Sequence, residues 1–378
     1  MLLVLLLLAA DAPRFVLQHE DALGEATWLD TATHGHRRYT VNDGLPDPSI
    51  QAIATDHEGR LWIGTQDGAA LFNGTAWRPL ELQTKLRSTE VRRVLRGKDG
   101  AMYVGTFGGG LVRKTRAGET LIDQRRGLAD NEVRALAEDD RGALWIATSS
   151  ALNVLAGDAV TVARPVDVAI DAICVSGGEI FVPIGKELQR YASADRRPTG
   201  AAIPLGDAVR SCLASDDGSV WLGGETSLMR VKDGAVERFG KDALGTVQFY
   251  ALAEGTVRGE RTLWAGTQNG ELVTYARGRF SKRTLVSSAI SALAFTSLGV
   301  PLLWVGSQEG IVRQNLGGWR AFPSGPAFLR QRTKGIVEDG RGRLWIGTAL
   351  GLGVADKTRT SFFTANAALG DSHIFSMK

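Results

Sequence analysis

The stretch LWIGTQDGA, residues 61 to 69, combines an apolar strand, one Trp, one Gly and a tight turn. It recurs along the chain as MYVGTFGGG, LWIATSSAL, IFVPIGKEL, VWLGGETSL, LWAGTQNGE, LWVGSQEGI and LWIGTALGL. Between Trp62 and Trp345 the aromatic residue of the motif returns at a period of roughly 40 residues, which is the period of propeller blades. The chain is therefore predicted to be an array of eight repeats.

Each repeat contains the pattern of four strands. An apolar stretch such as NEVRALAED, residues 131 to 139, precedes a turn rich in Asp and Gly, and two short strands follow the Trp motif. Strands joined by a few turn residues with Gly form hairpins, and four such strands form a blade. The sequence predicts an all-β fold, a β-propeller of four-stranded antiparallel blades. We expect seven blades, with the eighth repeat starting a second propeller; an eight-bladed ring is the alternative.

The composition of LWIGT follows from the alternation of side chains along a strand. Leu61, Ile63 and Thr65 face one adjacent blade, while Trp62 and Gly64 face the other. The Trp fills the wedge between blades, and the Gly leaves room for a neighbouring side chain. We therefore interpret the Trp row as core and not as a platform for ligands.

Residues 44 to 74, GLPDPSIQAIATDHEGRLWIGTQDGAALFNG, resemble the two-component regulator propeller repeat, with its D-x-x-G-x-L-W-I-G-T pattern. The resemblance covers about residues 36 to 378 and is weakest in the fourth repeat, where Phe181 and Pro183 replace Trp and Gly. Pro183 cannot donate to a strand ladder, so blade 4 should be distorted. The family builds periplasmic sensor regions of hybrid two-component systems and of some diguanylate cyclases.

The resemblance implies a function for the chain as part of a longer receptor. We expect an extracytoplasmic domain that senses a ligand, followed downstream by a histidine kinase, response regulator or diguanylate cyclase domain. The full-length receptor would be tethered to the membrane, and a homodimer is left open. Two alternatives remain at this point: a propeller lyase acting on polysaccharides or lactones, and a scaffold for protein interactions.

The two ends of the chain carry further signals. Residues 1 to 12, MLLVLLLLAADA, have the apolar run and the Ala-Asp-Ala ending of an export signal, which predicts a periplasmic protein. Residues 13 to 35 form a lead-in, and residues 36 to 378 hold the repeats. Residues 36 to 41 are expected to complete the last blade and so remove an open edge. The final ALGDSHIFSMK resembles the start of a ninth repeat.

No stretch of the sequence carries a catalytic signature. Nucleotide-binding, metalloprotease, serine-hydrolase, kinase and cyclase motifs are absent, so we expect no catalytic residue, metal or cofactor here. The net charge of +3 does not favour a nucleic-acid partner. Cys174 and Cys212 lie in apolar segments and are interpreted as two small buried hydrophobes in preference to a disulfide.

One position of the repeat stands out as a candidate binding site. The second residue of each first strand is Gln51, Arg92, Arg134, Asp171, Arg210, Tyr250, Ser291 and Lys334 in turn. Because first strands lie nearest the propeller axis, these residues should form a polar ring at one mouth of the central channel. Four basic residues against one acid predict a small-molecule or oligosaccharide ligand that carries carboxylates. The competing interpretation is that strand ends near solvent are polar by default.

Overall fold

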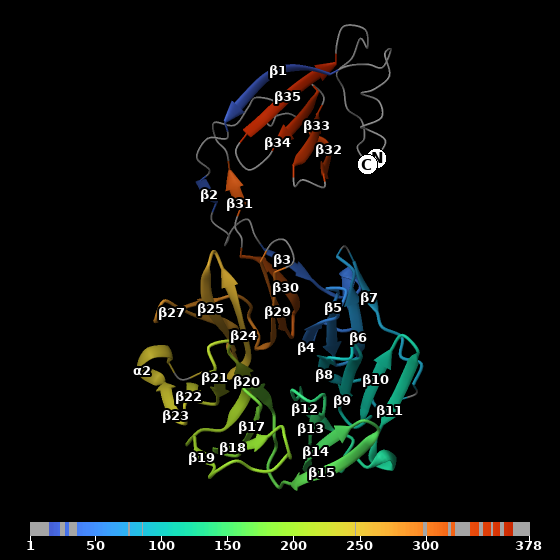
Figure 1. Cartoon of the computed structure of the whole chain (residues 1–378), viewed down its shortest axis with the longest axis vertical. Coiled ribbons are helices and arrows are strands. Elements are labelled where there is room, and N and C mark those ends of the chain that lie inside the picture. The colour runs from blue at the N-terminus through green and yellow to red at the C-terminus, as the bar shows by residue number, and fades with distance from the viewer. Residues whose placement is uncertain are drawn as a thin grey trace. The chain divides into compact units, whose positions relative to one another are not determined.

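The computed structural model describes residues 15–22, 27–29, 36–74, 76–84, 86–245, 247–297, 301–316, 319–321, 333–339, 343–348, 351–355 and 359–365. The chain divides into two compact units. Gly35–Gly317 form one, called here the ring unit, and Met1–His34 together with Gly318–Lys378 form the other, called the terminal unit. Figure 1 shows the strands of the ring unit arranged as sheets around a common centre.

The described residues of the ring unit form seven four-stranded antiparallel sheets, numbered here in chain order. Sheet 1 contains β4 (Ile50–Thr55), β5 (Leu61–Thr65), β6 (Gly68–Phe72) and β7 (Trp77–Pro79). Sheet 2 contains β8 (Val91–Arg96), β9 (Met102–Thr106), β10 (Leu111–Thr115) and β11 (Gly118–Ile122). Sheet 3 contains β12 (Val133–Glu138), β13 (Leu144–Thr148), β14 (Ala151–Ala156) and β15 (Ala159–Pro165). Sheet 4 contains β16 (Cys174–Ser176), β17 (Glu179–Ile184), β18 (Glu187–Ala192) and β19 (Ile203–Pro204). Sheet 5 contains β20 (Val209–Ala214), β21 (Val220–Gly224), β22 (Leu228–Lys232) and β23 (Ala235–Phe239).

Sheets 6 and 7 complete this unit. Sheet 6 contains β24 (Phe249–Val257), β25 (Glu260–Thr267), β26 (Glu271–Ala276) and β27 (Arg279–Thr284), and sheet 7 contains β28 (Ile290–Thr296), β29 (Leu302–Ser307), β30 (Gly310–Asn315) and β3 (His36–Tyr39). In the described part of this unit, three short helical turns lie between strands: η2 (Val41–Asp43), η3 (Gln124–Arg126) and α2 (Lys241–Leu244). The predicted all-β propeller of four-stranded antiparallel blades is confirmed.

The first and last sheets of the ring unit meet through the N-terminal strand. β3 pairs with β30, with Tyr39 opposite Ile311. Residues 36 to 39, the first strand of the ring unit in the sequence, thus complete sheet 7, whose other three strands come last in the sequence of this unit. The first strands of successive sheets pack against one another, and β28 packs against β4. Sheet 7 therefore lies next to sheet 1, and whether the ring has seven or eight blades stays a prediction.

The terminal unit holds the eighth repeat. Its five-stranded sheet has the order β1 (Phe15–Ala22), β35 (Arg359–Ala365), β34 (Leu352–Ala355), β33 (Leu344–Thr348) and β32 (Thr333–Glu338), and β2 (Thr27–Leu29) pairs with β31 (Trp319–Ala321). Whether this repeat begins a second propeller stays a prediction. The predicted export signal and the ALGDSHIFSMK segment lie outside the described residues. No helix among the described residues has the length and apolar character needed to cross a membrane.

The Trp row forms core between the sheets, as predicted. Trp62, Trp145, Trp221, Trp264 and Trp304 are each at most 4% exposed. The indole N–H of Trp145 donates to Asp139 Oδ2 at 3.0 Å, while Asp139 Oδ1 accepts from the backbone N–H groups of Arg141 and Ala143. Asp56 and Trp62 repeat this arrangement. The Asp of the motif thus shapes the turn and also satisfies a buried indole, which would otherwise lose a hydrogen bond.

The Gly of the motif is required by the next sheet. A Cβ added to Gly64 would lie 2.6 Å from Val91 Cγ1, and one added to Gly306 would lie 2.5 Å from Ile50 Cγ2. The same contact therefore joins sheet 1 to sheet 2 and sheet 7 to sheet 1. Leu61 and Ile63 pack towards sheet 7, and Trp62 packs towards sheet 2, in agreement with the predicted alternation.

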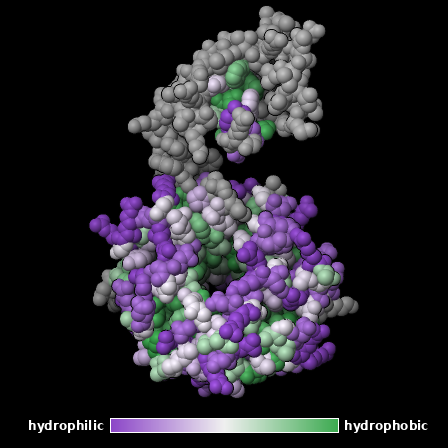
Figure 2. Space-filling model, viewed as in Figure 1, coloured by the Kyte–Doolittle hydropathy of each residue, from purple (hydrophilic) through white to green (hydrophobic). Residues whose placement is uncertain are grey.

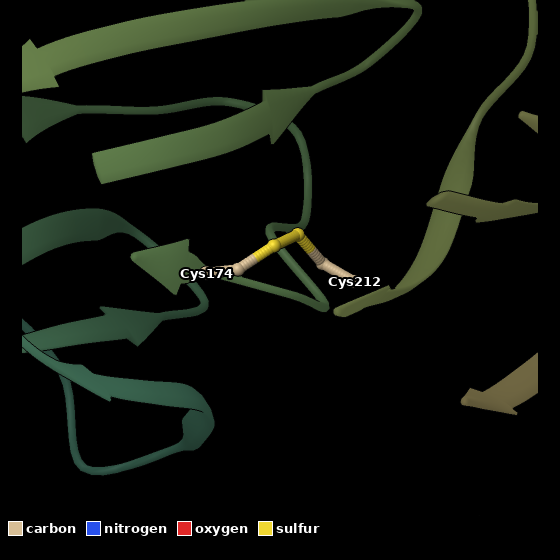
Figure 3. The surroundings of a disulfide bond; sticks show 2 residues. All are labelled: Cys174 and Cys212. Atoms are coloured by element: carbon tan, nitrogen blue, oxygen red, sulfur yellow. A yellow bond between two sulfur atoms is a disulfide. The ribbon is translucent and has the colours of Figure 1, made fainter. Parts of the chain in front are cut away.

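The two cysteines correct the interpretation made from the sequence. Cys174 of β16 and Cys212 of β20 form a disulfide, with a Cα–Cα distance of 5.8 Å that is ordinary for such a bond (Figure 3). The expectation of two separate buried hydrophobes is wrong. The residues lie 38 positions apart, about one repeat, and the stacking of first strands around the ring brings them together.

Replacement of Trp145 by Ala tests the core role of the Trp row. The side chain is fully buried, so Trp145→Ala should lower the free energy of unfolding by about 3 to 5 kcal/mol. Urea unfolding followed by circular dichroism measures this. Val162→Ala, at a side chain that is 48% exposed on β15, is the control and should change stability by less than about 0.5 kcal/mol. Equal effects of the two variants would contradict the assignment.

The disulfide should contribute measurably to stability. Cross-linking residues 38 positions apart removes chain entropy from the unfolded state, which corresponds to about 4 kcal/mol. The double variant Cys174→Ser, Cys212→Ser should be less stable by about that amount in denaturant unfolding. Adding a reductant should lower the stability of the natural chain and leave the double variant unchanged. A reductant-insensitive natural chain would show that the bond does not form.

Candidate functional site

The predicted ring residues occupy β-bulges in the first strands. The strand pairings shift register between Ile50 and Ala52, Val91 and Arg93, Val133 and Ala135, Val209 and Ser211, Phe249 and Ala251, and Ile290 and Ala292. The residues inside these shifts are Gln51, Arg92, Arg134, Arg210, Tyr250 and Ser291. A bulge leaves one residue outside the ladder and redirects its side chain. The repeat therefore presents one side chain per sheet at this position.

Sheet 4 reaches the same result by a different route. β16 pairs with β17 only from Cys174 to Ser176, so Asp171 precedes the strand and lies outside the ladder. Pro183 of β17 pairs with Leu188 on its other side, and it has no N–H to donate towards the segment of Asp171. The predicted distortion of this blade is confirmed, and the backbone carbonyl of Asp171 accepts from the Arg93 side chain.

These side chains line one cavity of about 230 Å³. Its lining consists of Gln51, Arg92, Arg93, Arg134, Asp171, Arg210, Tyr250 and Ser291. Seven of the eight predicted residues are therefore brought together, and they are called here the mouth ring. Figure 2 shows the ring unit hollowed near its centre. Lys334 lies on β32 in the terminal unit, so it does not belong to this ring.

Ion pairs connect the mouth ring across sheets 2 to 5. Asp171 Oδ1 accepts from Arg134 Nη2 at 2.5 Å, and Asp171 Oδ2 accepts from Arg210 Nη1 at 2.6 Å. Arg134 Nη1 also donates to Glu132 Oε1 at 2.6 Å, and Arg92 Nη1 reaches the same oxygen at 3.2 Å. At one end of this series Arg92 Nε lies 2.9 Å from Glu90 Oε1, and at the other end Arg210 Nη2 lies 2.6 Å from Glu225 Oε1. We call these seven residues the charged arc.

The sequence reasoning missed three carboxylates of the charged arc. Glu90 and Glu132 stand two residues before Arg92 and Arg134, a spacing that places side chains on the same side of an extended chain and could have revealed them. Glu225 lies 15 residues from Arg210 and comes close because Val209 pairs with Gly224. Together with Asp171 these groups offset the arginines, so the wider mouth carries balanced charge.

Arg93 is the second feature that the sequence reasoning missed. Its guanidinium donates to the backbone carbonyls of Asp171 at 3.0 Å and of Arg92 at 2.8 Å. Burial lowers the pKa of Arg93 to about 10, although the charge of Asp171 opposes this shift. The corresponding residue in the other repeats is Ala, Ser or Gly. That single departure from a small residue was the signal available in the sequence.

The remaining part of the mouth ring is neutral. The Tyr250 hydroxyl donates to Gln248 Oε1 at 2.7 Å, and the Ser291 hydroxyl donates to the backbone carbonyl of Ile50. Gln51 makes no side-chain hydrogen bond within the described part of the chain. The cavity therefore has a charged side formed by sheets 2 to 5 and a neutral, hydrogen-bonding side formed by sheets 6, 7 and 1.

Asp171 is the carboxylate shared by two arginines of the charged arc. Burial by itself would raise the pKa of the Asp171 carboxyl, but the adjacent Arg134 and Arg210 guanidinium groups outweigh it and hold the pKa below its usual value. The carboxylate therefore stays ionised at neutral pH. Among the described residues, no group of three or more His, Cys, Asp or Glu side chains is arranged to hold a metal ion.

The charged arc should contribute to stability in a pH-dependent way. Asp171→Asn removes the charge shared by Arg134 and Arg210 and should destabilise the chain at pH 7 by about 1.5 to 3 kcal/mol. Because the folded-state pKa of Asp171 lies below its usual value, this contribution is present above about pH 4 and is lost as the pH falls through the folded-state value.

Urea unfolding between pH 7 and pH 2 checks this expectation. The difference in stability between the natural chain and Asp171→Asn should shrink towards acid. Asp158→Asn, on an exposed turn of sheet 3, is the control and should follow the natural chain at every pH. A difference that does not vary with pH would mean that the charge of Asp171 is not what matters.

Comparisons with known proteins give a family match and a fold match. The model of the two-component regulator propeller family matches residues 44–67 and 127–150. No curated protein matches the chain in sequence. Among solved structures, two extracellular domains of putative two-component systems from B. thetaiotaomicron are similar, with TM-scores of 0.61 and 0.58 at 17% and 18% identity. Each alignment covers 87% of this chain and 49% or 47% of the other, so this chain spans about half their length.

Propellers of a different kind are similar too. Virginiamycin B lyase from Staphylococcus aureus aligns with a TM-score of 0.56 at 13% identity, over 74% of this chain and 98% of the lyase. Structural similarity at such low sequence identity shows a shared fold, and it says nothing about activity. The family match and the four-stranded sheets both indicate a propeller built of repeats. The chain is a β-propeller that carries two-component regulator propeller repeats at residues 44–67 and 127–150.

Proposed function

We propose that this chain is the ligand-sensing propeller of an extracytoplasmic receptor, whose output domain lies outside the sequence described here. The observation that carries the proposal is the mouth ring, in which every sheet of the ring unit contributes one polar side chain to a single cavity. Loops and strand ends that converge on one point are a common way for a propeller or barrel to bind a small molecule. Such a site can report occupancy to a downstream domain.

Three observations support an extracytoplasmic location. The disulfide between Cys174 and Cys212 is of a kind that persists in oxidising compartments such as the periplasm. The first 12 residues have the character of an export signal. The solved structures described above include extracellular domains of two-component systems. We therefore propose export, with the longer receptor tethered to the membrane and free to form a homodimer.

The ligand of the proposed site is a small polar molecule, or the end of an oligosaccharide, that carries a carboxylate. The cavity of about 230 Å³ lies below the usual range of roughly 300 to 1,000 Å³ for ligand pockets. It therefore admits a compact group and not a long chain. Guanidinium groups of Arg92 and Arg210, each partly exposed, can receive a carboxylate through paired hydrogen bonds.

Filling the cavity tests the proposal without disturbing the charged arc. Gln51 lines the cavity, so Gln51→Trp should occupy the space and abolish binding. Calorimetric titration of the chain with acidic and neutral oligosaccharides and with small carboxylic acids measures this. Asp158→Trp, on the exposed turn of sheet 3, introduces the same side chain elsewhere and should bind normally.

Four results would count against the proposal. Undiminished binding in Gln51→Trp would place the site outside the mouth ring. Equal binding of neutral and carboxylated compounds would remove the role of the arginines. Turnover of a bound compound would assign the chain to the enzymes, and the absence of binding by every compound would reject sensing at this cavity.

A further inference from the structure

We infer that Arg93 is the residue of the cavity that binds the negative charge of the ligand, and that the ligand is a compact hydroxy acid with a single carboxylate. The inference rests on the proposed function and narrows its ligand class. It follows from a difference between Arg93 and the other arginines that line the cavity. Those arginines are held by carboxylates, whereas Arg93 is held by backbone carbonyls.

The side chain of Arg93 crosses the interior of the ring unit. Arg93 belongs to β8 of sheet 2, and its Nη2 donates to the backbone carbonyl of Asp171, which precedes β16 of sheet 4. Sheet 3 lies between these two sheets, because its first strand, β12, packs against both β8 and β16. The guanidinium therefore passes β12 on the side of the ring axis, and Arg93 is itself one of the residues that line the cavity.

Each of the other three arginines that line the cavity already pairs with two carboxylates. The pairs are Arg92 with Glu90 and Glu132, Arg134 with Glu132 and Asp171, and Arg210 with Asp171 and Glu225. An anion that took one of these arginines would leave a partly buried carboxylate without its partner, and an unsatisfied charged group is costly. The paired arginines are therefore poor places for a second anion.

Arg93 keeps hydrogen-bonding capacity that is open to the channel. A guanidinium has five N–H groups, and Arg93 uses one from Nη1 and one from Nη2, on the carbonyls of Arg92 and Asp171. Its Nε makes no hydrogen bond to a described residue, and unlike the Nε of Arg210 it is not buried. Within the described part of the chain, Arg93 forms no ion pair. It is thus a cation with donors to spare.

The charges that act on Arg93 are mostly positive. Burial lowers its pKa to about 10, the charge of Asp171 opposes this shift, and the charges of Arg92 and Arg134 add to it. The guanidinium therefore stays charged at neutral pH. A bound carboxylate would stabilise it, because an opposite charge nearby favours the charged form. The three glutamates of the charged arc do not line the cavity, so a carboxylate bound there does not face them.

The neutral side of the mouth ring would receive hydroxyl groups of the ligand. The hydroxyls of Tyr250 and Ser291 donate to Gln248 and to the backbone carbonyl of Ile50. No described residue donates to either hydroxyl oxygen, so both can accept from a ligand. A second carboxylate would find no further unpaired cation among the described residues of the lining, and about 230 Å³ admits only a compact molecule. These features together favour a hydroxy acid with one carboxylate.

The experiment compares matched compounds on the whole chain by calorimetric titration. The probes are lactate and gluconate, each with its amide, with the acid that lacks the hydroxyls (propionate, hexanoate) and with the corresponding dicarboxylate (tartronate, glucarate). At least one hydroxy acid should bind, and its amide should bind about tenfold or more weakly, the loss expected for a charge-assisted hydrogen bond. The acid without hydroxyls should bind more weakly as well, and the dicarboxylate should bind no more tightly.

Removing the charge of Arg93 gives the sharper test. Arg93→Gln should weaken binding of the hydroxy acid by about tenfold or more and leave binding of the amide nearly unchanged, so the preference for the acid disappears. Arg93→Ala introduces the residue that stands at the equivalent position of sheets 1, 3, 6 and 7, and it should have the same effect.

Arg96→Gln is the matched control. Arg96 lies on the same strand and also donates to a backbone carbonyl, that of Asp56 at 3.5 Å, but it does not line the cavity. This variant should bind like the natural chain. Thermal unfolding of each variant shows whether a loss of binding reflects a loss of fold, and the comparison of acid with amide on the natural chain needs no variant.

The outcomes separate this inference from the proposed function. An undiminished preference for the acid in a folded Arg93→Gln or Arg93→Ala chain overturns the role of Arg93. Tighter binding of the dicarboxylate, or equal binding of the acid without hydroxyls, overturns the ligand class. In each case a loss of binding in Gln51→Trp leaves the sensing site standing. Failure of every hydroxy acid to bind also overturns the inference, and the proposed function is then decided by the compounds used above.

Discussion

The pairing of β3 with β30 is the contact on which the ring unit depends. Every sheet of a propeller has two apolar faces, and each face is covered only if a neighbour stands on both sides. Tyr39 of β3 is buried against Phe72, Trp77 and Trp304, so one strand joins the cores of the first and last sheets. Outside the core, Glu309 accepts from the Ser287 hydroxyl and from Arg38, and these bonds lower its pKa to about 2. The closing strand is thus held by backbone bonds, aromatic packing and one ionised carboxylate.

The cavity is a consequence of this closure. Bulges redirect one side chain from each first strand, but those side chains meet only because the strands stand around one axis. The contacts of the charged arc join residues about one repeat apart, such as Arg134 with Asp171 and Arg92 with Glu132. The ion pairs beside the cavity therefore also tie sheets 2 to 5 together.

The departures from the repeat carry most of what is specific to this chain. Pro183 interrupts the ladder of sheet 4 and leaves the Asp171 carbonyl to Arg93, which itself replaces a small residue of the repeat. Cys174 and Cys212 join the same two first strands that Asp171 and Arg210 connect through their side chains. A regular repeat supplies the scaffold, and its exceptions gather at the junction of sheets 2, 4 and 5.

The sequence by itself determined the fold class, the Trp core, the role of the motif Gly and the closing strand, because each of these follows from strand alternation and a fixed period. It also identified seven residues that meet at the mouth, since equivalent positions of a closed repeat must lie on one circle. It did not reveal the disulfide, nor three of the four carboxylates that balance the arginines, Glu90, Glu132 and Glu225. Cys174 and Cys212 occupy different positions within their repeats, and Glu225 belongs to a turn. Such partners are decided by packing between neighbouring sheets, a tertiary relation that no period along the chain records.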